Sequence, residues 1–597
     1  MCGLAALFAH HPDAPPVDGA ELRAINAAMA ARGPDGDGHW VADDGRVGLA
    51  HRRLAIIDLS DAAAQPMVLR PGGPGGGDGP EYRITYNGEI YNFRALRDEL
   101  IAAGAPVTTQ SDTEVLLHLY HRHGPDMVHR LRGMFALAIW DGPRRGLFLA
   151  RDSFGIKPLY YADDGRTLRV ASQVKALRAG GVAGTGVDPA GHVGFFLMGS
   201  VPDPHTLYAD IRALPAGCTL WADGGGVGAP VRYDDIPARL RAAGAAGVDL
   251  RDALLDSVRH HFVADVEVGV FLSAGLDSAT ITGLASEIRG ADLRTLTVAF
   301  DEFAGRDLDE APLARRVADL YGTNHTEVRV PADWFDDQRD AVLAAMDQPT
   351  IDGINVYLVA QAAARAGLKV ALSGTGGDEL FAGYNVFRRV PLLYRALRWI
   401  NAPPPLGWAG ALAAHLGARL RPTPKVRSLA RLAPTVRNAY IIARGLYMPW
   451  ELDTVLDPDL VRAGTAALRL FDDADTADEA SADTSRARVT GFEVGLYLCN
   501  QLLRDSDWAG MAHSLEIRVP LVDLALYDRV LAGLTSGHPP GKADMAATPA
   551  TPLPGSVLNR PKTGFAVPFR SWMPDGQATS DYDRRGWART VYAAFTA

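Results

Sequence analysis

Cysteine is almost absent from this sequence. Only Cys2, Cys218 and Cys499 occur among its 597 residues. Three thiols in so long a chain cannot form a disulfide framework, so the composition predicts a protein of a reducing compartment.

Long apolar runs and an excess of positive charge are also absent. No stretch approaches the ~18 apolar residues that a membrane span needs. The N-terminus has no basic region and too short an apolar run for a signal peptide. The net charge is −10, whereas proteins that bind nucleic acid are usually basic. We therefore expect a cytoplasmic protein with neither a membrane nor a nucleic acid as partner.

The length predicts more than one domain, since a domain usually holds ~100–250 residues. Residues 82–86 and 134–140 are typical of short strands in a first domain. The glycine-rich stretch 224–228 predicts a linker. The expected segments are a first domain (residues 1–222), a linker (223–248), a second domain (249–535) and a C-terminal loop and tail (536–597).

Strands alternate with helices in the second domain. The predicted strands are residues 266–272, 293–300, 326–330 and 368–372, and the predicted helices include residues 311–321 and 355–366. A further helix is expected to start near Ser278, after a glycine turn. Such alternation is typical of a parallel α/β sheet.

Cys2 directly follows the initiator methionine. A small second residue favours removal of that methionine, which would leave Cys2 with a free α-amine. The amine has a reference pKa near ~7.7–8.0, so part of it is neutral at pH 7 and can serve as the base for the thiol. Taken alone, a cysteine at this position more often has no function.

Six short motifs follow Cys2 along the first domain. They are RGPD (residues 32–35), HRRLAIID (51–58), NGEIYN (87–92), SDTE (111–114), RGMFA (132–136) and RDSFGIKPLYY (151–161). In this order and spacing they resemble the glutaminase domain of class II glutamine amidotransferases. The resemblance covers nearly all of the first 215 residues, and its motifs are highly specific.

The resemblance implies roles for the matching residues. Cys2 is the implied nucleophile, and the Asn87 side chain and the Gly88 N–H are the implied donors to the oxyanion. A free glutamine presents a carboxylate, an ammonium and the scissile amide. The implied glutamine-binding residues are Arg53 for the carboxylate, Glu89 and Asp112 for the ammonium, and Leu54, Ala55, Ile56, Ile57, Asn87 and Gly88.

Some of these residues have plain structural alternatives. Asn87-Gly88 alone would predict a hairpin turn. His51 is more typical of a structural histidine than of a catalyst, and we predict that residues 32–35 shape a loop. Within the full series, a functional role is favoured for Asn87 and Gly88.

Two loops of the second domain carry another set of motifs. SAGLDS (residues 273–278) resembles the pyrophosphate loop of ATP pyrophosphatases, and SGTGGDELFAGY (373–384) resembles the signature of asparagine synthetases. Loops at the carboxyl ends of parallel strands are where such a sheet binds nucleotide. Backbone N–H groups and a helix N-terminus favour phosphate there. For the first loop alone, an ordinary strand–helix turn is the alternative.

The resemblance implies ATP and Mg²⁺ as cofactors. The implied ATP-binding residues are Phe271, Ser273, Gly275, Asp277, Ser278, Val298, Ser373 and Gly374. Asp277 and Asp378 are the implied Mg²⁺ ligands, because carboxylate and phosphate oxygens suit that ion. For Asp378 the structural alternative is a charge at a helix N-terminus.

Two later stretches, residues 507–523 and 560–565, also resemble asparagine synthetase motifs. Lys562 in the second stretch is implied to stabilise charge on the activated intermediate. The alternative for Lys562 is an ordinary surface lysine.

Five positions depart from the family pattern. They are Gln173 and Thr375, each at a position often acidic, Ala274 at a glycine-type position, Trp508 for Arg and Gly510 for Ser. Ala274 would be strained if its position required a positive φ. Trp508 either offers an apolar face to a bulkier acceptor or packs in the helical core.

The expected fold class is α/β: an α+β N-terminal-nucleophile hydrolase domain, with two β-sheets between helical layers, followed by a parallel α/β ATP-pyrophosphatase-type synthetase domain. The expected ligase transfers ammonia from glutamine to a carboxylic acid that ATP activates as an acyl-adenylate. Aspartate is the first candidate acceptor, which would make asparagine.

Three other functions remain open. The acceptor could be a sugar acid or a natural-product precursor, and the chain could be a degenerate, non-catalytic homologue. A sugar-phosphate amidotransferase would share the glutaminase half, although such enzymes need no ATP. A homodimer is a further open alternative.

Overall fold

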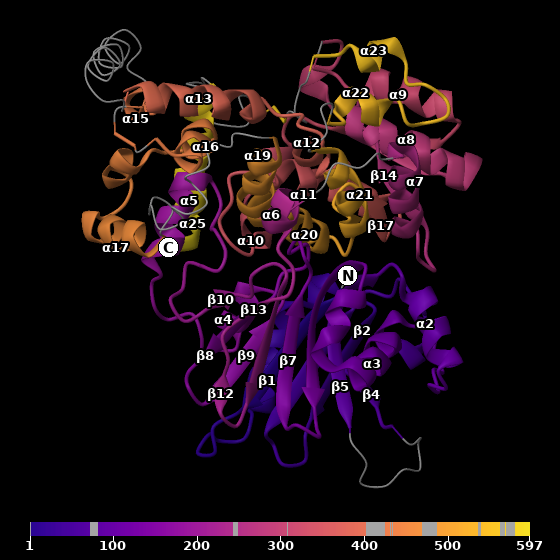
Figure 1. Cartoon of the computed structure of the whole chain (residues 1–597), viewed down its shortest axis with the longest axis vertical. Coiled ribbons are helices and arrows are strands. Elements are labelled where there is room, and N and C mark those ends of the chain that lie inside the picture. Colours follow the sequence, from indigo (N-terminus) through magenta and orange to yellow (C-terminus); the bar gives the residue numbers. More distant parts are fainter. Residues whose placement is uncertain are drawn as a thin grey trace.

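The computed structural model describes residues 2–71, 81–242, 249–306, 308–400, 424–429, 431–432, 434–468, 486–534, 539–561, 567–568 and 580–596. Figure 1 shows the first domain as the lower half of the molecule and the second domain as most of the upper half. The N-terminal end of the chain lies at the junction of the two halves.

Two antiparallel sheets form the first domain. The first contains, in spatial order, β10 (Arg212–Ala213), β8 (Tyr160–Asp163), β9 (Thr167–Ala171), β1 (Gly3–Ala9), β3 (Val47–Arg53) and β2 (Gly36–Val41). The second contains β12 (Gly226–Val227), β11 (Cys218–Asp223), β7 (Gly146–Arg151), β6 (Gly133–Asp141), β5 (Tyr82–Ile90) and β4 (Met67–Leu69), and β13 (Val231–Arg232) also pairs with β11.

Helices cover the outer faces of these sheets. Leu22 and Ile25 of α1 (Gly19–Ala28) and Leu177 of α4 (Val174–Ala179) pack on the first sheet. Helices α2 (Phe93–Ala102) and α3 (Asp112–His123) pack on the second. Leu4 and Trp140 belong to the apolar layer between the sheets. This arrangement confirms the prediction of two sheets between helical layers.

The glycine-rich stretch 224–228 is a hairpin and not a linker. It contains the turn between β11 and β12, and both strands belong to the second sheet, as does β13. The sheet therefore continues through the expected boundary at residue 222. The next described element, α6 (Ile236–Ala242), already packs against the second domain, because Leu240 lies in a cluster with Val494 and Leu498.

A single parallel sheet forms the centre of the second domain. Its strand order is β16 (Asn324–Val330), β15 (Arg294–Phe300), β14 (Val268–Phe271), β17 (Val370–Leu372) and β18 (Glu516–Arg518), and every neighbouring pair is parallel. Strands β15 and β16 follow one another on one side of β14, and β17 and β18 follow one another on the other side. The loops after β14 and β17 therefore flank the point where the strand order reverses, which is where such sheets bind ligands.

The remaining helices surround this sheet and extend to one side of it. They are α7 (Leu250–His261), α8 (Leu276–Arg289), α9 (Ala311–Tyr321), α10 (Trp334–Ala345), α11 (Ile354–Arg365), α12 (Gly377–Leu380), α13 (Val386–Ile400), α15 (Pro424–Ser428), α16 (Val436–Arg444), α17 (Pro458–Leu468), α19 (Arg486–Phe492), α20 (Arg504–Met511), α21 (Leu524–Leu534), α22 (Lys542–Ala546), α23 (Gly555–Leu558) and α25 (Ser580–Thr596). Between α19 and α20 the chain is a π-helix, η8 (Glu493–Leu503), so residues 486–511 form one continuous helical rod.

The last helix packs back onto a helix of the first 222 residues. Figure 1 shows α25 beside α5 (Pro189–Met198), away from the parallel sheet. The Tyr592 hydroxyl lies 2.7 Å from His192 Nδ1, and the Tyr592 ring contacts Phe196. Two segments about 400 residues apart are thus held together.

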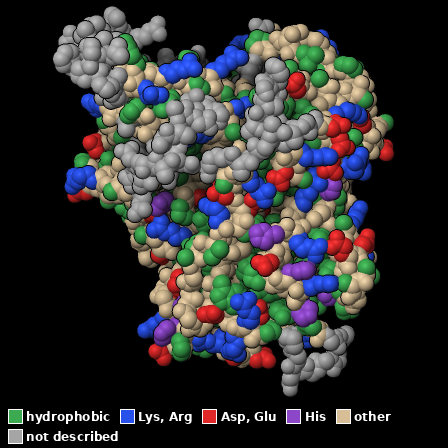
Figure 2. All heavy atoms as spheres, in the orientation of Figure 1, with side chains coloured by type: hydrophobic (Ala, Val, Ile, Leu, Met, Phe, Trp, Pro, Cys, Tyr) green, Lys and Arg blue, Asp and Glu red, His purple; other side chains and the backbone are tan. Residues whose placement is uncertain are grey.

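Acidic and basic side chains are interspersed over the face seen in Figure 2, without a large field of either sign. Among the described residues, no helix is both long enough and apolar enough to cross a bilayer.

Candidate active sites

Cys2 lies just before β1, at the junction of the two halves. Its main-chain N–H donates to Asn87 Oδ1 over 3.0 Å, and its Sγ lies 3.9 Å from the carbonyl oxygen of Leu54. Burial raises the pKa of the Cys2 thiol, so a base is needed to form the nucleophilic thiolate. The structure therefore brings the nucleophile candidate together with two of the implied glutamine-site residues.

Asn87 and Gly88 lie inside strand β5, where they pair with Ala136 and Phe135 of β6. The hairpin-turn alternative is therefore excluded. Asn87 is completely buried, and its Nδ2 has no hydrogen-bond partner among the described residues. A buried amide N–H with no partner is costly unless it serves a ligand. Beside Cys2, this donor could serve an oxyanion.

Two implied glutamine-binding residues are held by neighbouring groups, Arg53 by the backbone of a loop and Asp112 by strand β5. Arg53 Nη1 donates to the carbonyl oxygen of Ser60 over 2.8 Å, and Nη2 donates to that of Asp58. Asp112, at the start of α3, accepts from the Tyr86 hydroxyl and from the Ile90 N–H over 3.0 and 3.2 Å. Burial raises the pKa of Asp112 to about 6, so the carboxyl titrates close to neutral pH.

Glu89 faces the second domain. One of its carboxylate oxygens lies 3.5 Å from Arg518 Nη2 of β18, and the side chains of both residues are buried. Burial, and then the neighbouring Glu516 carboxylate, raise the pKa of Glu89 well above its ordinary value. The implied ammonium site is thus in contact with a strand of the second domain, which the sequence reasoning did not anticipate.

His51 takes a structural position. Its Nε2 lies 3.1 Å from the carbonyl oxygen of Tyr86, and burial lowers the pKa of its ring to about 3. The ring is therefore neutral at physiological pH and donates to that carbonyl, which links β3 to β5.

The two nucleotide-loop motifs meet at the carboxyl edge of the parallel sheet. Ser273 and Ser278 close the first loop, with their hydroxyl oxygens 2.8 Å apart, and Gly275 N–H donates to Ser273 Oγ over 3.2 Å. A Cβ on Gly374 would lie 2.9 Å from Asp277 Cβ and 3.1 Å from Ser278 N. Only glycine lets the second loop approach the first so closely.

Lys542 joins the two implied metal ligands. Its Nζ contacts Asp277 Oδ1 and lies 2.9 Å from Asp378 Oδ1. Burial opposes the charge on Lys542, but the two carboxylates outweigh that effect and raise its pKa. Gly383 makes room for this contact, because a Cβ there would overlap Asp378 Oδ1 and Lys542 Cε. The sequence offered no signal for Lys542, which lies in a stretch predicted to be a loop and starts α22.

Asp277 and Asp378 lie in the first turns of α8 and α12, directly after the two loops. Such a pair of carboxylates suits Mg²⁺, a hard cation that in nucleotide sites usually takes one or two carboxylates together with phosphate oxygens. Among the described residues, no group of three or more His, Cys, Asp or Glu side chains could hold a metal ion. Two carboxylates alone would leave most of the coordination of such an ion to other oxygens.

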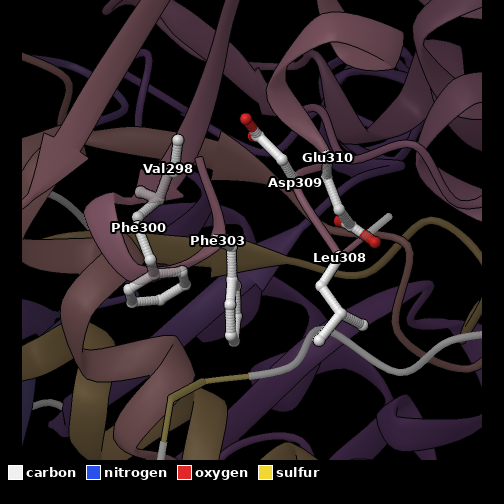
Figure 3. A pocket seen from close by; sticks show the side chains of 7 residues that line it. Val298, Phe300, Phe303, Leu308, Asp309 and Glu310 are labelled. Atoms are coloured by element: carbon white, nitrogen blue, oxygen red, sulfur yellow. The ribbon is translucent and has the colours of Figure 1, made fainter. Parts of the chain in front are cut away.

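A small pocket opens beside β15 (Figure 3). Its lining residues are Val298, Ala299, Phe300, Phe303, Leu308, Asp309 and Glu310. The Phe303 ring lies between Phe300 and Leu308 in this view, with the Asp309 and Glu310 side chains at one side. Val298, an implied adenine contact, therefore lines an apolar wall next to two carboxyl groups, and Phe271, the other implied contact, ends the neighbouring strand β14.

The structure gives physical reasons for several departures. Ala274 is buried and is not among the residues with positive φ, so alanine carries no backbone strain there. A Cβ on Gly510 would lie 2.7 Å from the Leu515 carbonyl oxygen, which disfavours serine. Thr375 Oγ1 lies 2.9 Å from Ser373 Oγ within the second loop. Gln173 is buried just before α4.

Trp508 packs in the core. It is 2% exposed, its Nε1 donates to Asp505 Oδ1 over 2.8 Å, and its ring lies 6.2 Å from that of Tyr357. Of the two alternatives for Trp508, this arrangement agrees with packing and leaves no free indole face for an acceptor.

Lys562 lies outside the described residues. Two residues earlier in the sequence, Arg560 Nη1 donates to Glu310 Oε1 over 3.0 Å. Glu310 lines the pocket of Figure 3, so Arg560 contacts a wall of that pocket.

Comparisons with known proteins assign both halves. Residues 1–233 match the family model described as a glutamine amidotransferase domain, and residues 249–586 match the one described as asparagine synthase.

Three curated proteins are similar to the chain at the sequence level. A putative glutamine-hydrolysing asparagine synthetase of Mycobacterium tuberculosis is 33% identical over 97% of this chain and 89% of its own length. Glutamine-hydrolysing asparagine synthetase 1 of Bacillus subtilis is 31% identical over 99% and 90%. Amidase chry2 of Gibberella zeae is 31% identical over 65% and 60%.

Proposed function

The chain belongs to the asparagine synthase family as a glutamine-hydrolysing ligase, and from this membership we propose that it amidates a carboxylic acid in two steps, through an acyl-adenylate. Glutamine supplies the nitrogen in the first domain and ATP activates the acceptor in the second. The partners are glutamine, ATP and the acceptor, and we place the enzyme in the cytoplasm, where its thiols stay reduced.

In the glutaminase half, the α-amine of Cys2, free once Met1 is removed, takes the proton of the thiol, and the thiolate attacks the side-chain carbonyl carbon of glutamine. The developing oxyanion accepts hydrogen bonds from Asn87 Nδ2 and from the Gly88 N–H. The α-ammonium then gives its proton to the amide nitrogen, and ammonia leaves as the thioester forms. Water then hydrolyses the thioester and glutamate departs. Support comes from the Asn87 amide, which is buried beside Cys2 with Nδ2 unpartnered within the described part of the chain.

Glutamine is held at both of its charged ends. The Arg53 fork binds its carboxylate, and Asp112 with Glu89 binds its ammonium. The backbone carbonyls that already accept from Arg53, and the Tyr86 hydroxyl that donates to Asp112, fix these side chains before the substrate enters. The segment of residues 54–57 lies next to the thiol, since the Leu54 carbonyl oxygen is 3.9 Å from Sγ.

In the synthetase half, an acceptor carboxylate oxygen attacks the α-phosphorus of ATP and pyrophosphate leaves. Ammonia from the first domain then attacks the acyl carbon, and AMP leaves as the amide forms. Ser273, Gly275, Ser278, Ser373 and Gly374 would bind the phosphates and sugar through hydroxyl and N–H groups, with Val298 and Phe271 next to the base.

Asp277 and Asp378 would hold Mg²⁺, which neutralises charge on the phosphates when it is bound. Lys542 contacts both carboxylates and carries a positive charge. With ATP present, we propose that this ammonium pairs with phosphate oxygens at the same edge of the sheet. Lys562 retains its proposed role at the activated intermediate.

Aspartate is the proposed acceptor, and asparagine the product. The buried position of Trp508 removes one argument for a bulkier acid. Thr375 still lacks the charge that family members commonly carry there, so other carboxylic acids belong in the same test. A sugar-phosphate amidotransferase is disfavoured, because the second half matches the asparagine synthase model.

One observation carries this proposal: Asp277 and Asp378, in the first turns of α8 and α12 and about 100 residues apart, meet at Lys542 where the strand order reverses. The test is a screen for pyrophosphate release with ATP, Mg²⁺ and glutamine over aspartate and other carboxylic acids. We expect release that depends on both ATP and an acceptor, with aspartate the most active. Release of inorganic phosphate and ADP instead would contradict the adenylate mechanism.

A further inference from the structure

A buried ion pair crosses from the glutaminase half to the synthetase half beside the nucleophile. Arg32 lies in the short 3₁₀ turn η1 (Ala30–Arg32), and its Nη1 and Nη2 donate to Asp507 Oδ2 and Oδ1 over 2.7 and 3.0 Å. The third donor, Nε, reaches the carbonyl oxygen of Cys2 over 3.0 Å. One guanidinium thus contacts both the synthetase domain and the backbone of the nucleophile.

Both partners of the ion pair are buried. The side chains of Arg32 and Asp507 are 2% and 4% exposed. A fork-to-carboxylate pair of this kind fixes orientation as well as charge. If Asp507 is replaced by a neutral residue, the Arg32 guanidinium stays buried without its counter-charge. We expect the Arg32 side chain to reorient, because an unpaired buried charge is costly. The position of the Arg32 side chain therefore depends on a carboxylate that the other domain supplies.

The backbone of Cys2 is held at both of its polar groups. Asn87 Oδ1 accepts from its N–H, and Arg32 donates to its C=O. Loss of the second bond frees rotation about the backbone next to the thiol, while Arg53 and Asp112, which bind glutamine, are untouched. A displacement of about 1 Å at a nucleophile is enough to slow attack by orders of magnitude without loss of binding.

Asp507 belongs to a rod that also reaches the nucleotide loops. At the other end of residues 486–511, Thr490 Oγ1 donates to the carbonyl oxygen of Glu379, the residue after Asp378, over 3.1 Å. Next to Asp507, Asp505 accepts from Thr350 and Trp508. The carboxylate that orients Arg32 is therefore part of an element anchored at the synthetase site.

We propose that Asp507 of the synthetase domain is a positioning residue for glutamine hydrolysis: through Arg32 it holds the Cys2 carbonyl, so the glutaminase site is complete only when the synthetase domain is docked. This inference rests on the proposed role of Cys2 and adds to it a residue from the other domain. It differs from the sequence-based expectation that residues 32–35 only shape a loop.

The test compares Asp507→Asn with a matched control, Asp523→Asn. Asp523 is also a buried synthetase aspartate in a bidentate pair with a glutaminase arginine, Arg132, at 2.9 Å for both bonds. No bond from Arg132 to Cys2 is present among the described contacts. Thermal unfolding of both variants shows whether the domains remain folded and docked.

For Asp507→Asn we expect kcat for glutamate release to fall at least tenfold, with the KM for glutamine within about twofold of wild type. Arg32→Lys keeps the positive charge but loses the two parallel N–H donors, so it should also lower kcat while leaving KM nearly unchanged. The double variant should lose no more kcat than either single variant. Asp523→Asn should keep kcat within about threefold.

Two results would overturn the inference. One is a wild-type kcat for Asp507→Asn, and the other is an equal fall in both aspartate variants, which would indicate general loosening of the interface. If Asp507→Asn does not fold, Arg32→Lys is the test: a wild-type kcat for that variant would overturn the inference. A wild-type protein without glutaminase activity would instead refute the proposed function.

Discussion

At the scale of single residues, the first prediction concerns Cys2, the proposed nucleophile. We predict that Cys2→Ala abolishes glutamate release and leaves synthesis from added ammonia within a few-fold of wild type, because the nucleophile and the nucleotide loops lie on separate sheets. Parallel assays of glutamate and of ammonia-dependent pyrophosphate release would check this. Retention of wild-type glutamate release would show that another group attacks.

A second residue-scale prediction concerns Asp112. Burial raises the pKa of this carboxyl to about 6, so it loses its charge as the pH falls through 6. Because we propose that the charged form pairs with the glutamine ammonium, kcat/KM for glutamine should fall about tenfold per pH unit below that value. The matched variant Asp112→Asn should have a low kcat/KM without this acid limb. A wild-type profile that is flat from pH 7 to pH 5 would refute the role.

At the scale of elements, the closest approach is that of the two nucleotide loops. We predict that Gly374→Ala reduces ATP cleavage by at least tenfold, because its Cβ would lie 2.9 Å from Asp277 Cβ and push the loops apart. Glutamate release should persist. The control is Gly586→Ala in α25, where a Cβ meets nothing within 4 Å. Equal ATP cleavage in Gly374→Ala and wild type would show that the loops tolerate separation.

The sequence predicted most elements near this site. The strands at residues 293–300 and 326–330 and the helices at 311–321 and 355–366 were found within two residues of β15, β16, α9 and α11, because long runs with a clear period carry a strong signal. Strand β18 was missed. It has three residues, and two of them, Glu516 and Arg518, are charged yet fully buried by pairing with each other.

The residues of the candidate site could be predicted where they belong to a sequence motif. They could not be predicted where only the tertiary structure brings them together. Asp277 and Asp378 stood in recognisable loops. Lys542 is an isolated lysine in a proline-rich stretch, and only the tertiary structure places it between the two carboxylates. The partner of Arg32 was equally hidden, since Asp507 is 475 residues away.

At the scale of the whole molecule, the two proposed sites lie in different halves and should be separable by mutation. We predict that Asp277→Asn and Asp378→Asn each abolish ATP cleavage and that removal of Mg²⁺ with EDTA does the same. Glutamate release should continue in both cases, because the two carboxylates lie in the first turns of α8 and α12, after strands of the parallel sheet, and the proposed nucleophile belongs to the other half. Separate assays of glutamate and pyrophosphate would check this, and a loss confined to glutamate release would contradict the assignment.

The most direct test of the central claim follows one nitrogen through the protein. Glutamine labelled with ¹⁵N at its amide is supplied with ATP, Mg²⁺ and aspartate, and the products are analysed by mass spectrometry. We predict asparagine labelled at its amide, with AMP and pyrophosphate formed in equal amounts. Glutamate and labelled ammonia without any amide product, for aspartate and for every other acid in the screen, would contradict it.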